Sequence, residues 1–270
     1  MGHAPPCGQG EAVKRLHIVG CPRSGTTLLM ELVSTCFDSS GYCAHELSIF
    51  EPLENPGPLY FSKQPNDIKQ IGHIFHRDPG LNIIYLGRDP RAVMTSKHRE
   101  NPGQYFCNYR VWSECDRAAQ RYWEHPRFLP LRYEDLVTRP DEVQKGICAH
   151  FDFMESRYPF SEYHLHATPS GDASRAMNGL REIDLDSLAK WRQHLPRVAE
   201  QLQRHPALAN DLVRLGYEPD RRWLEALAGV EPVVYPCRYP ERRPYLKEWE
   251  KSIRVYFKSR RYLQRLATAG

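Results

Sequence analysis

The stretch Gly20-Cys21-Pro22-Arg23-Ser24-Gly25-Thr26-Thr27 decides how the rest of the chain is interpreted. A short β-rich run, Arg15 to Gly20, precedes it, and the apolar residues from Leu28 to Cys36 recur behind it with helical spacing. A strand, a glycine-containing loop and a helix in direct succession predict a phosphate-binding loop, because loop N–H groups and a helix N-terminus together bind phosphate oxygens. The alternative is a tight strand-to-helix turn without a ligand.

This loop departs from the usual nucleotide-binding P-loop at one position. It has the Gly-x4-Gly frame, but Thr26 stands where a lysine normally reaches the β- and γ-phosphates. Arg23 restores a cation inside the loop, and an arginine there can fork onto phosphate oxygens or neutralise a departing oxygen. The hydroxyls of Ser24, Thr26 and Thr27 are further donors. We therefore expect the segment from Pro22 to Thr27 to hold one phosphate rather than a magnesium nucleoside triphosphate.

A second anion site is predicted at Gly87-Arg88-Asp89-Pro90-Arg91-Ala92-Val93-Met94-Thr95-Ser96. Arg88 follows a buried-type strand, and open α/β sheets bind ligands at such strand ends. Pro90 suits the first turn of a helix, and Ser96 lies about two helical turns after Arg88. Arg88 and Ser96 can thus close on one anion, although an Arg–Asp helix cap would explain the same residues. Two separated anion sites fit a nucleoside 3′,5′-bisphosphate.

The alternation of strands and helices predicts the fold class. We expect an α/β protein, a P-loop-type three-layer sandwich with a mainly parallel sheet, plus a helical C-terminal extension. The expected strands are 15–20, 42–50 with its outgoing loop, 82–87 and 128–133, and the expected helices include 64–77, 110–123 and 140–151. Residues 155–182 lack periodicity and indicate long loops, whereas 185–227 are expected to be helical.

Three regions are expected along the chain. Residues 1–14 form a flexible leader, 15–228 the main domain, and 229–270 a Pro-rich link followed by a basic amphipathic helix from about Tyr245. From Arg238 onward there are ten Lys/Arg and three Asp/Glu, a net charge of +7, so the rest of this +4 chain carries −3. The basic character is therefore local and does not imply nucleic-acid binding. The final helix either docks on the core or contacts an anionic substrate, a partner or a membrane surface.

The composition indicates in which compartment the protein resides and whether it contains disulfides or a metal site. A hydrophobic content of 41% and a charged content of 26% are ordinary for globular proteins, and no stretch approaches the ~20 apolar residues that span a bilayer. Eight cysteines without a Cys-x-x-Cys pair predict free thiols, with a Cys36–Cys43 disulfide as the alternative. We expect a cytoplasmic protein, with the luminal part of a longer protein as the alternative. Two histidine pairs, His73/His76 and His164/His166, lack further ligands, so no metal is expected.

Together, the two phosphate motifs resemble those of the PAPS-dependent sulfotransferase family, where PAPS is 3′-phosphoadenosine 5′-phosphosulfate. The residues from Cys21 to Leu29 are similar to its 5′-phosphosulfate loop, and Arg88 through Ser96 to its 3′-phosphate motif. Two further segments, 132–136 (RYEDL) and 187–195 (SLAKWRQHL), resemble its carbohydrate-type and bacterial branch, and the likeness covers about residues 15–218. It implies transfer of a sulfuryl group from PAPS to an acceptor hydroxyl of a small molecule or a carbohydrate, leaving adenosine 3′,5′-bisphosphate.

The same resemblance implies roles for individual residues. The 5′-phosphosulfate would be bound by Arg23, Gly25, Thr26 and Thr27, and the 3′-phosphate by Arg88 and Ser96, while Arg175 and Trp191 would cover the donor. In the carbohydrate-type relatives, the catalytic base is a glutamate after the second strand. Glu46 in the segment 45–50 (HELSIF) fits this position best, Glu51 in 50–53 (FEPL) is the competitor, and His45 is a further alternative.

The acceptor side is less defined. Its pocket is expected from the loops 52–66, 98–110 and 155–182, with Lys97 and Arg99 as candidates to face the acceptor. Two other functions stay open: a P-loop kinase or NTPase, which would need a lysine where Thr26 stands, and a nucleotide-binding module without catalysis. The oligomeric state is not predicted.

Overall fold

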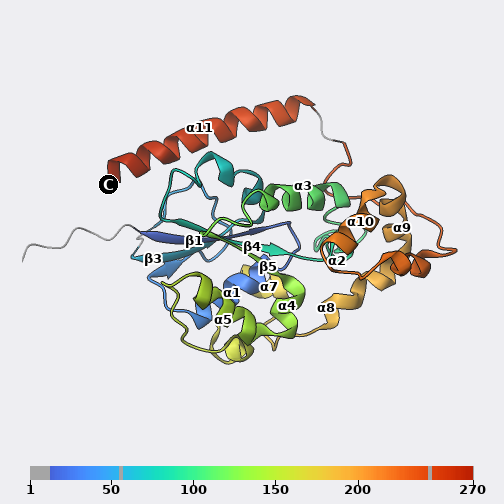
Figure 1. Ribbon diagram of the computed structural model, residues 1–270, viewed down its shortest axis with the longest axis horizontal. Coiled ribbons are helices and arrows are strands. Elements are labelled where there is room, and N and C mark those ends of the chain that lie inside the picture. Colours follow the sequence, from blue (N-terminus) through green and yellow to red (C-terminus); the bar gives the residue numbers. More distant parts are fainter. Residues whose placement is uncertain (1–12, 55–56, 243–244, 270) are drawn as a thin grey trace, which may run out of the picture.

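A five-stranded parallel sheet forms the centre of the computed structural model, which describes residues 13–54, 57–242 and 245–269 (Figure 1). The strands are β1 (Lys14–Gly20), β2 (Gly41–Tyr42), β3 (Leu59–Lys63), β4 (Leu81–Gly87) and β5 (Phe128–Arg132). Their order across the sheet is β2-β3-β1-β4-β5, and every adjacent pair is parallel. Residues 1–12 of the expected leader lie outside the described residues, and Lys14 already belongs to the first strand.

Successive side chains of the central strands enter two separate cores, as the period of two in a strand requires. Leu16 and Ile18 of β1 belong to one apolar cluster, whereas Val19 belongs to the other. In β4, Ile84 joins the first cluster and Tyr85 the second. The strands β1 and β4 are buried on both faces, which is why their sequences are nearly continuous apolar runs.

Helices cover both faces of the sheet (Figure 1). On one face lie α1 (Thr26–Cys36), α4 (Tyr133–Thr138) and α5 (Pro140–His150), and on the other lie α3 (Tyr109–Gln120) and α11 (Tyr245–Ala269). The remaining α-helices are short: α2 (Pro90–Met94), α6 (Tyr163–His166), α7 (Gly171–Met177), α8 (Asp186–Ala189), α9 (Leu195–Arg204) and α10 (Ala207–Arg214). The α/β three-layer fold with a helical C-terminal extension is thereby confirmed.

Two predicted elements between the first helix and β4 are wrong. The strand expected at 42–50 consists only of Gly41–Tyr42, and the inner strand of this region is Leu59–Lys63. Tertiary pairing decides this, because Leu59–Lys63 is hydrogen-bonded between β1 and β2. The helix expected at 64–77 is two 3₁₀ turns, Pro65–Lys69 and Ile71–His73, and Gly72 within the second turn lowers α-helix propensity by about 1 kcal/mol.

Parts of the C-terminal half also differ from the prediction. The region 155–182, expected to be loops, contains the short helices α6 and α7. The helical region 185–227 is confirmed, but as five short segments that include the 3₁₀ turns Lys190–His194 and Arg221–Leu227. The seven described cysteines are all free thiols, so Cys36 and Cys43 form no disulfide. Among the described helices, none combines the length and the apolarity that crossing a bilayer requires.

The strand order places a binding crevice beside β1. The chain adds β2 and β3 on one side of β1 and then crosses to add β4 on the other side. Such a reversal separates the loops that leave neighbouring strands, and ligands bind in the crevice outside their carboxyl ends. Gly20 at the end of β1 pairs with Leu86 of β4. The loop after Gly20 and the motif after Gly87 therefore start side by side.

Candidate active site

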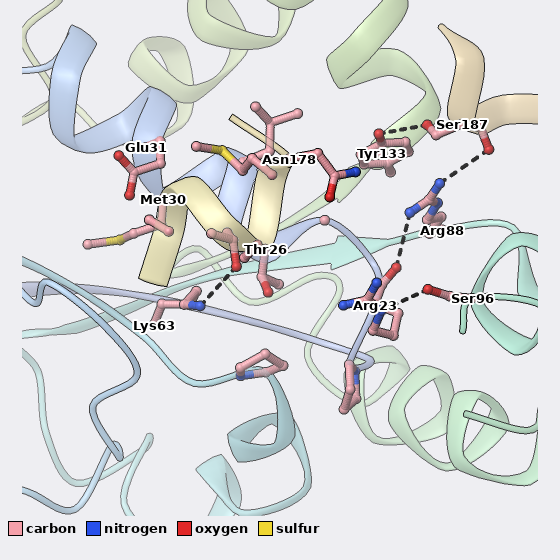
Figure 2. A pocket seen from close by; sticks show the side chains of 18 of the residues that line it. Arg23, Thr26, Met30, Glu31, Lys63, Arg88, Ser96, Tyr133, Asn178 and Ser187 are labelled. Carbon is pink, nitrogen blue, oxygen red and sulfur yellow. Dashed lines mark hydrogen bonds between the residues drawn. The ribbon is translucent and has the colours of Figure 1, made fainter. Parts of the chain in front are cut away.

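A cavity of about 530 Å³ lies at this crevice, within the usual range for ligand pockets. Its wall includes the loop 22–28, the end of β3, the second motif and the segment 172–194 (Figure 2). Arg23, Thr26, Lys63, Arg88 and Ser96 all line it. The structure therefore brings both predicted phosphate motifs to one cavity.

The phosphate loop keeps its shape through two unusual backbone positions. Gly25 has φ +98°, and a Cβ there would lie 2.4 Å from the ring of Tyr133, so only glycine fits. Arg23 has φ +76°, a strained conformation for a residue with a side chain, and such strain is concentrated at ligand sites. Because Gly25 caps α1 without a side chain, the first N–H groups of the helix are left for a ligand.

Arg23 joins the two motifs. Its Nε donates to Ser96 Oγ at 2.7 Å, and its carbonyl accepts from Arg88 Nη1 at 3.1 Å (Figure 2). Arg88 also donates to the carbonyl of Ser187 at 3.3 Å, and its guanidinium lies 4.0 Å from the ring centre of Tyr133. The guanidinium of Arg23 thus points at the second motif, whereas the sequence interpretation assigned it to the first.

The cations around Arg23 are close enough to repel one another. Desolvation lowers the pKa of the Arg23 guanidinium, and the charges of Arg88 and Arg99 lower it further. Arg88 Nε is buried without a hydrogen-bond partner among the described residues. An anion would offset the repulsion and accept from Arg88 Nε, so this group of residues fits a phosphate.

Lys63, which the sequence interpretation missed, supplies a cation to the loop from another strand. Its side chain is 5% exposed, and its Nζ donates to Thr27 Oγ1 at 3.1 Å (Figure 2). The P-loop lysine that Thr26 replaces is therefore compensated in space by the last residue of β3. The sequence signal that could have identified Lys63 is its position directly after the β-type run 59–62 (LYFS) and just before Gln64 and Pro65.

Of the two candidate bases, Glu46 lines the cavity and Glu51 does not. Glu46 Oε1 lies 3.6 Å from Lys63 Nζ, and the adjacent Leu47 N–H donates to the Lys63 carbonyl at 3.0 Å. The Glu51 carbonyl instead lies 3.4 Å from Arg15 Nη1, at the opposite end of β1 from the phosphate loop. His45 also lines the cavity.

A buried polar network holds the turn that follows Glu46. Arg15 donates to the carbonyls of Ile49 at 2.9 Å and Ser48 at 3.1 Å, and the Asp67 carboxylate accepts from the Ile49 N–H at 2.5 Å. His17 Nε2 lies 3.4 Å from Asp67 Oδ2, and complete burial lowers the pKa of His17 to about 4. The loop with Glu46 is therefore anchored to the sheet by hydrogen bonds to its main chain.

The two residues expected to cover the donor lie differently. Trp191 is buried, lines the cavity and stacks on the guanidinium of Arg91 at 4.1 Å. Arg175 is exposed, pairs with Asp172 and does not line the cavity. Other residues of its segment do, and Arg99 Nη2 donates to Asn178 Oδ1 at 3.2 Å, which ties this segment to the second motif.

Two more predicted site residues have distinct surroundings. Pro22 lines the cavity, whereas Ser24 is fully buried beneath it with no hydrogen-bond partner for its hydroxyl among the described residues.

Glu134, in the segment 132–136, accepts a hydrogen bond from the Asp89 N–H at 2.9 Å, and burial raises the pKa of its carboxyl. Glu134 thus fixes the start of α2, on which Ser96 depends for its position.

A model of the sulfotransferase family matches residues 40–155. The match contains the Arg88–Ser96 and Arg132–Leu136 motifs, Lys63 and both candidate bases, and it begins after the phosphate loop. It confirms the resemblance to PAPS-dependent sulfotransferases that these motifs indicated.

Three solved structures are similar to this chain, and the first of them has the same overall fold. The sulfotransferase domain from the curacin biosynthetic pathway is 19% identical, with a TM-score of 0.51 over 68% of this chain and 92% of that one. The sulfotransferase domain of the Synechococcus PCC 7002 olefin synthase is 19% identical, with a TM-score of 0.45 over 71% and 91% of the two chains. A retinol dehydratase solved with androsterone and the inactive cofactor PAP is 14% identical, with a TM-score of 0.46 over 76% and 82%.

Proposed function

We propose that this chain is a sulfotransferase that transfers a sulfuryl group from PAPS to an acceptor hydroxyl, because a model of the sulfotransferase family matches residues 40–155. The donor supplies an activated sulfuryl group on a bridging phosphate oxygen, and adenosine 3′,5′-bisphosphate is the leaving product.

The meeting of the two motifs at Arg23 carries the proposal. The hydrogen bonds from Arg23 to Ser96 and from Arg88 to the Arg23 carbonyl create one cationic group at the second motif. Lys63 and the N-terminus of α1 form another, with Thr27 between them. Two cationic groups in one cavity suit a ligand with two separate anions, such as a 3′-phosphate and a 5′-phosphosulfate.

We assign the 3′-phosphate to Arg23, Arg88 and Ser96. Thr26, Thr27 and the N–H groups of the first turn of α1 would hold the 5′-phosphosulfate, and Lys63 would neutralise charge on its oxygens as the bond to sulfur breaks. Trp191 would pack against the donor from the cavity wall.

Glu46 is the proposed general base. Its carboxylate lines the cavity beside Lys63, where it can accept the proton of an acceptor hydroxyl held opposite the leaving phosphate. Lys63 would hold this carboxylate near the phosphate loop. Glu51 would take no part, because it lies outside the cavity wall.

The acceptor side of the cavity favours a polar, hydroxylated molecule, with a carbohydrate as our first candidate. Besides Glu46, this wall presents Glu31, Asp172, Arg181 and Glu182. Such groups hydrogen-bond sugar hydroxyls, whereas a lipid-like acceptor would require a mostly apolar wall.

Thermal unfolding with different nucleotides tests the proposal. Adenosine 3′,5′-bisphosphate should raise the Tm more than AMP does, because AMP lacks the 3′-phosphate, and ATP with Mg²⁺ should have little effect. Transfer of labelled sulfate from PAPS to a panel of saccharides and small phenols then tests catalysis. Stabilisation by ATP–Mg²⁺ alone would favour a kinase or NTPase, and bisphosphate binding with no transfer to any acceptor would favour a silent module.

A further inference from the structure

The C-terminal helix α11 has an apolar stripe on its outward surface. Its inward side packs on the core through Val255 and Ser259, which are 8% and 5% exposed. Trp249, Ile253 and Tyr256 lie at positions i, i+4 and i+7, so they share another face, and their exposed fractions are 61%, 37% and 49%. Phe257, 57% exposed, widens the stripe. These four side chains are exposed, whereas Val255 of the same helix belongs to the core cluster on which α11 packs.

A basic band runs parallel to this stripe. Arg254, Lys258 and Arg261 follow the same i, i+4, i+7 spacing, five residues after the apolar series, and all three are exposed. The segment from Arg238 to the C-terminus carries a net charge of +7, against −3 for the remainder of the chain. The outward surface of α11 is therefore both apolar and cationic.

We infer that α11 docks this protein on an anionic membrane surface. Helices that lie in a membrane interface combine Trp and Phe on one face with Lys and Arg on the other. Aromatic side chains with polar edges suit the headgroup level, and a cytoplasmic leaflet with anionic lipids attracts each nearby cation. Trp249 and Phe257 would insert into the headgroup region while Arg254, Lys258 and Arg261 pair with lipid phosphates and carboxylates.

The charge distribution favours a lipid surface over a second copy of the chain. Two copies joined through this stripe would bring two basic bands together, and like charges in contact oppose association. A lipid surface has the opposite charge and also accepts the apolar side chains. The helix would lie along the membrane, consistent with the absence of a spanning helix among the described residues.

Docking through α11 leaves the active site free. No described residue of α11 lines the cavity. The contacts that hold the helix are made by its inward side: the Tyr262 hydroxyl donates to Asp78 and Arg265 donates to the Phe50 carbonyl. The outward side chains are therefore available to a membrane without unfolding this interface, and the inference does not depend on the proposed sulfuryl transfer.

Vesicle sedimentation of the full chain at physiological salt tests the inference. Binding to vesicles of phosphatidylcholine with phosphatidylserine should exceed binding to phosphatidylcholine alone. The triple variant Arg254→Gln/Lys258→Gln/Arg261→Gln should lose about 10- to 100-fold in affinity for the anionic vesicles. The control Lys145→Gln/Arg157→Gln/Arg222→Gln removes the same charge from exposed positions elsewhere and should bind like the wild type.

Tryptophan fluorescence gives a direct second readout. The emission of the wild type should shift to the blue on anionic vesicles, and Trp249→Phe should abolish that shift while its Tm stays unchanged. Equal binding to both vesicle types, or equal losses in the α11 triple variant and its control, would overturn the inference. A blue shift that survives Trp249→Phe would place the contact elsewhere and overturn it too, and binding of the wild type to RNA instead of vesicles would assign the basic band to nucleic acid.

Discussion

The proposed phosphate side and the proposed acceptor side of the cavity are built in different ways. The phosphate side consists mainly of two continuous segments, 20–27 and 87–96, which leave adjacent strand ends. The proposed acceptor side includes the loop after β2 and residues of the segment 172–182, and Lys63 at the end of β3 borders both sides. Local sequence therefore encodes the phosphate side, whereas the acceptor side forms only when segments distant in the sequence pack together.

The difference also concerns how each side is held. Backbone conformation at Arg23 and Gly25 shapes the phosphate loop from within. Glu46 is exposed and is positioned from outside, by Lys63 and by the buried network around Arg15 and Asp67. The following substitutions test whether this division extends to binding and turnover.

Substituting Glu46 should have the largest effect. Glu46→Gln removes the proposed base but keeps the size of the side chain, so kcat should fall by about 10²- to 10⁴-fold. The Kd for adenosine 3′,5′-bisphosphate should stay close to that of the wild type. Glu51→Gln is the matched control and should keep normal turnover; the reverse result for the two variants would assign the base to Glu51.

Substituting Lys63 should affect both sides of the cavity. Lys63→Met removes the cation beside Thr27 and Glu46, so kcat/KM for PAPS should fall by about 10²-fold as stabilisation of the leaving group is lost. Steady-state kinetics at several donor concentrations would measure this loss. Lys145→Met, at an exposed position on α5, provides the control, and equal activity of the two variants would contradict a role of Lys63 in the reaction.

Substituting Arg88 should affect the phosphate side alone. Arg88→Ala removes charge-assisted hydrogen bonds, so the preference for adenosine 3′,5′-bisphosphate over AMP should fall by about 10- to 100-fold. Isothermal titration with both nucleotides measures this ratio. Arg175→Ala should leave it unchanged, because Arg175 is exposed and lies outside the cavity wall; a comparable loss there would mean that its segment closes over the donor.

Substituting His17 should have the smallest effect at neutral pH and a clear effect in acid. Burial lowers the pKa of His17 from 6.5 to about 4, so the unfolded state takes up the proton first. Stability is complete above pH 6.5 and should fall by about 3 kcal/mol as the pH drops from 6.5 to 4. Urea denaturation at both pH values should show a weaker pH dependence for His17→Gln, whereas the exposed control His150→Gln should retain the dependence of the wild type.

The elements that the sequence predicted correctly are set by local signals, and the ones that it missed depend on long-range packing. The strand before Gly20, the helix after Thr27 and the motif from Arg88 to Ser96 were predictable, because spacing and glycine placement are local signals. The strand 59–63 was not, since a five-residue strand takes its identity from pairing with β1 and β2. Missing that strand also meant missing Lys63.

By itself, the sequence determined the α/β class, the phosphate loop with its missing lysine, the second anion motif and the resemblance to sulfotransferases. These depend on residues close together in the chain, whose conformations are set by short-range sterics and hydrogen bonding. Only the tertiary structure decided that Arg23 reaches Ser96, that Lys63 reaches Thr27 of the phosphate loop, and that Glu46 rather than Glu51 lines the cavity. These relations depend on strand order and register. Both are set by the burial of residues that are far apart in the sequence, so local sequence patterns do not reveal them.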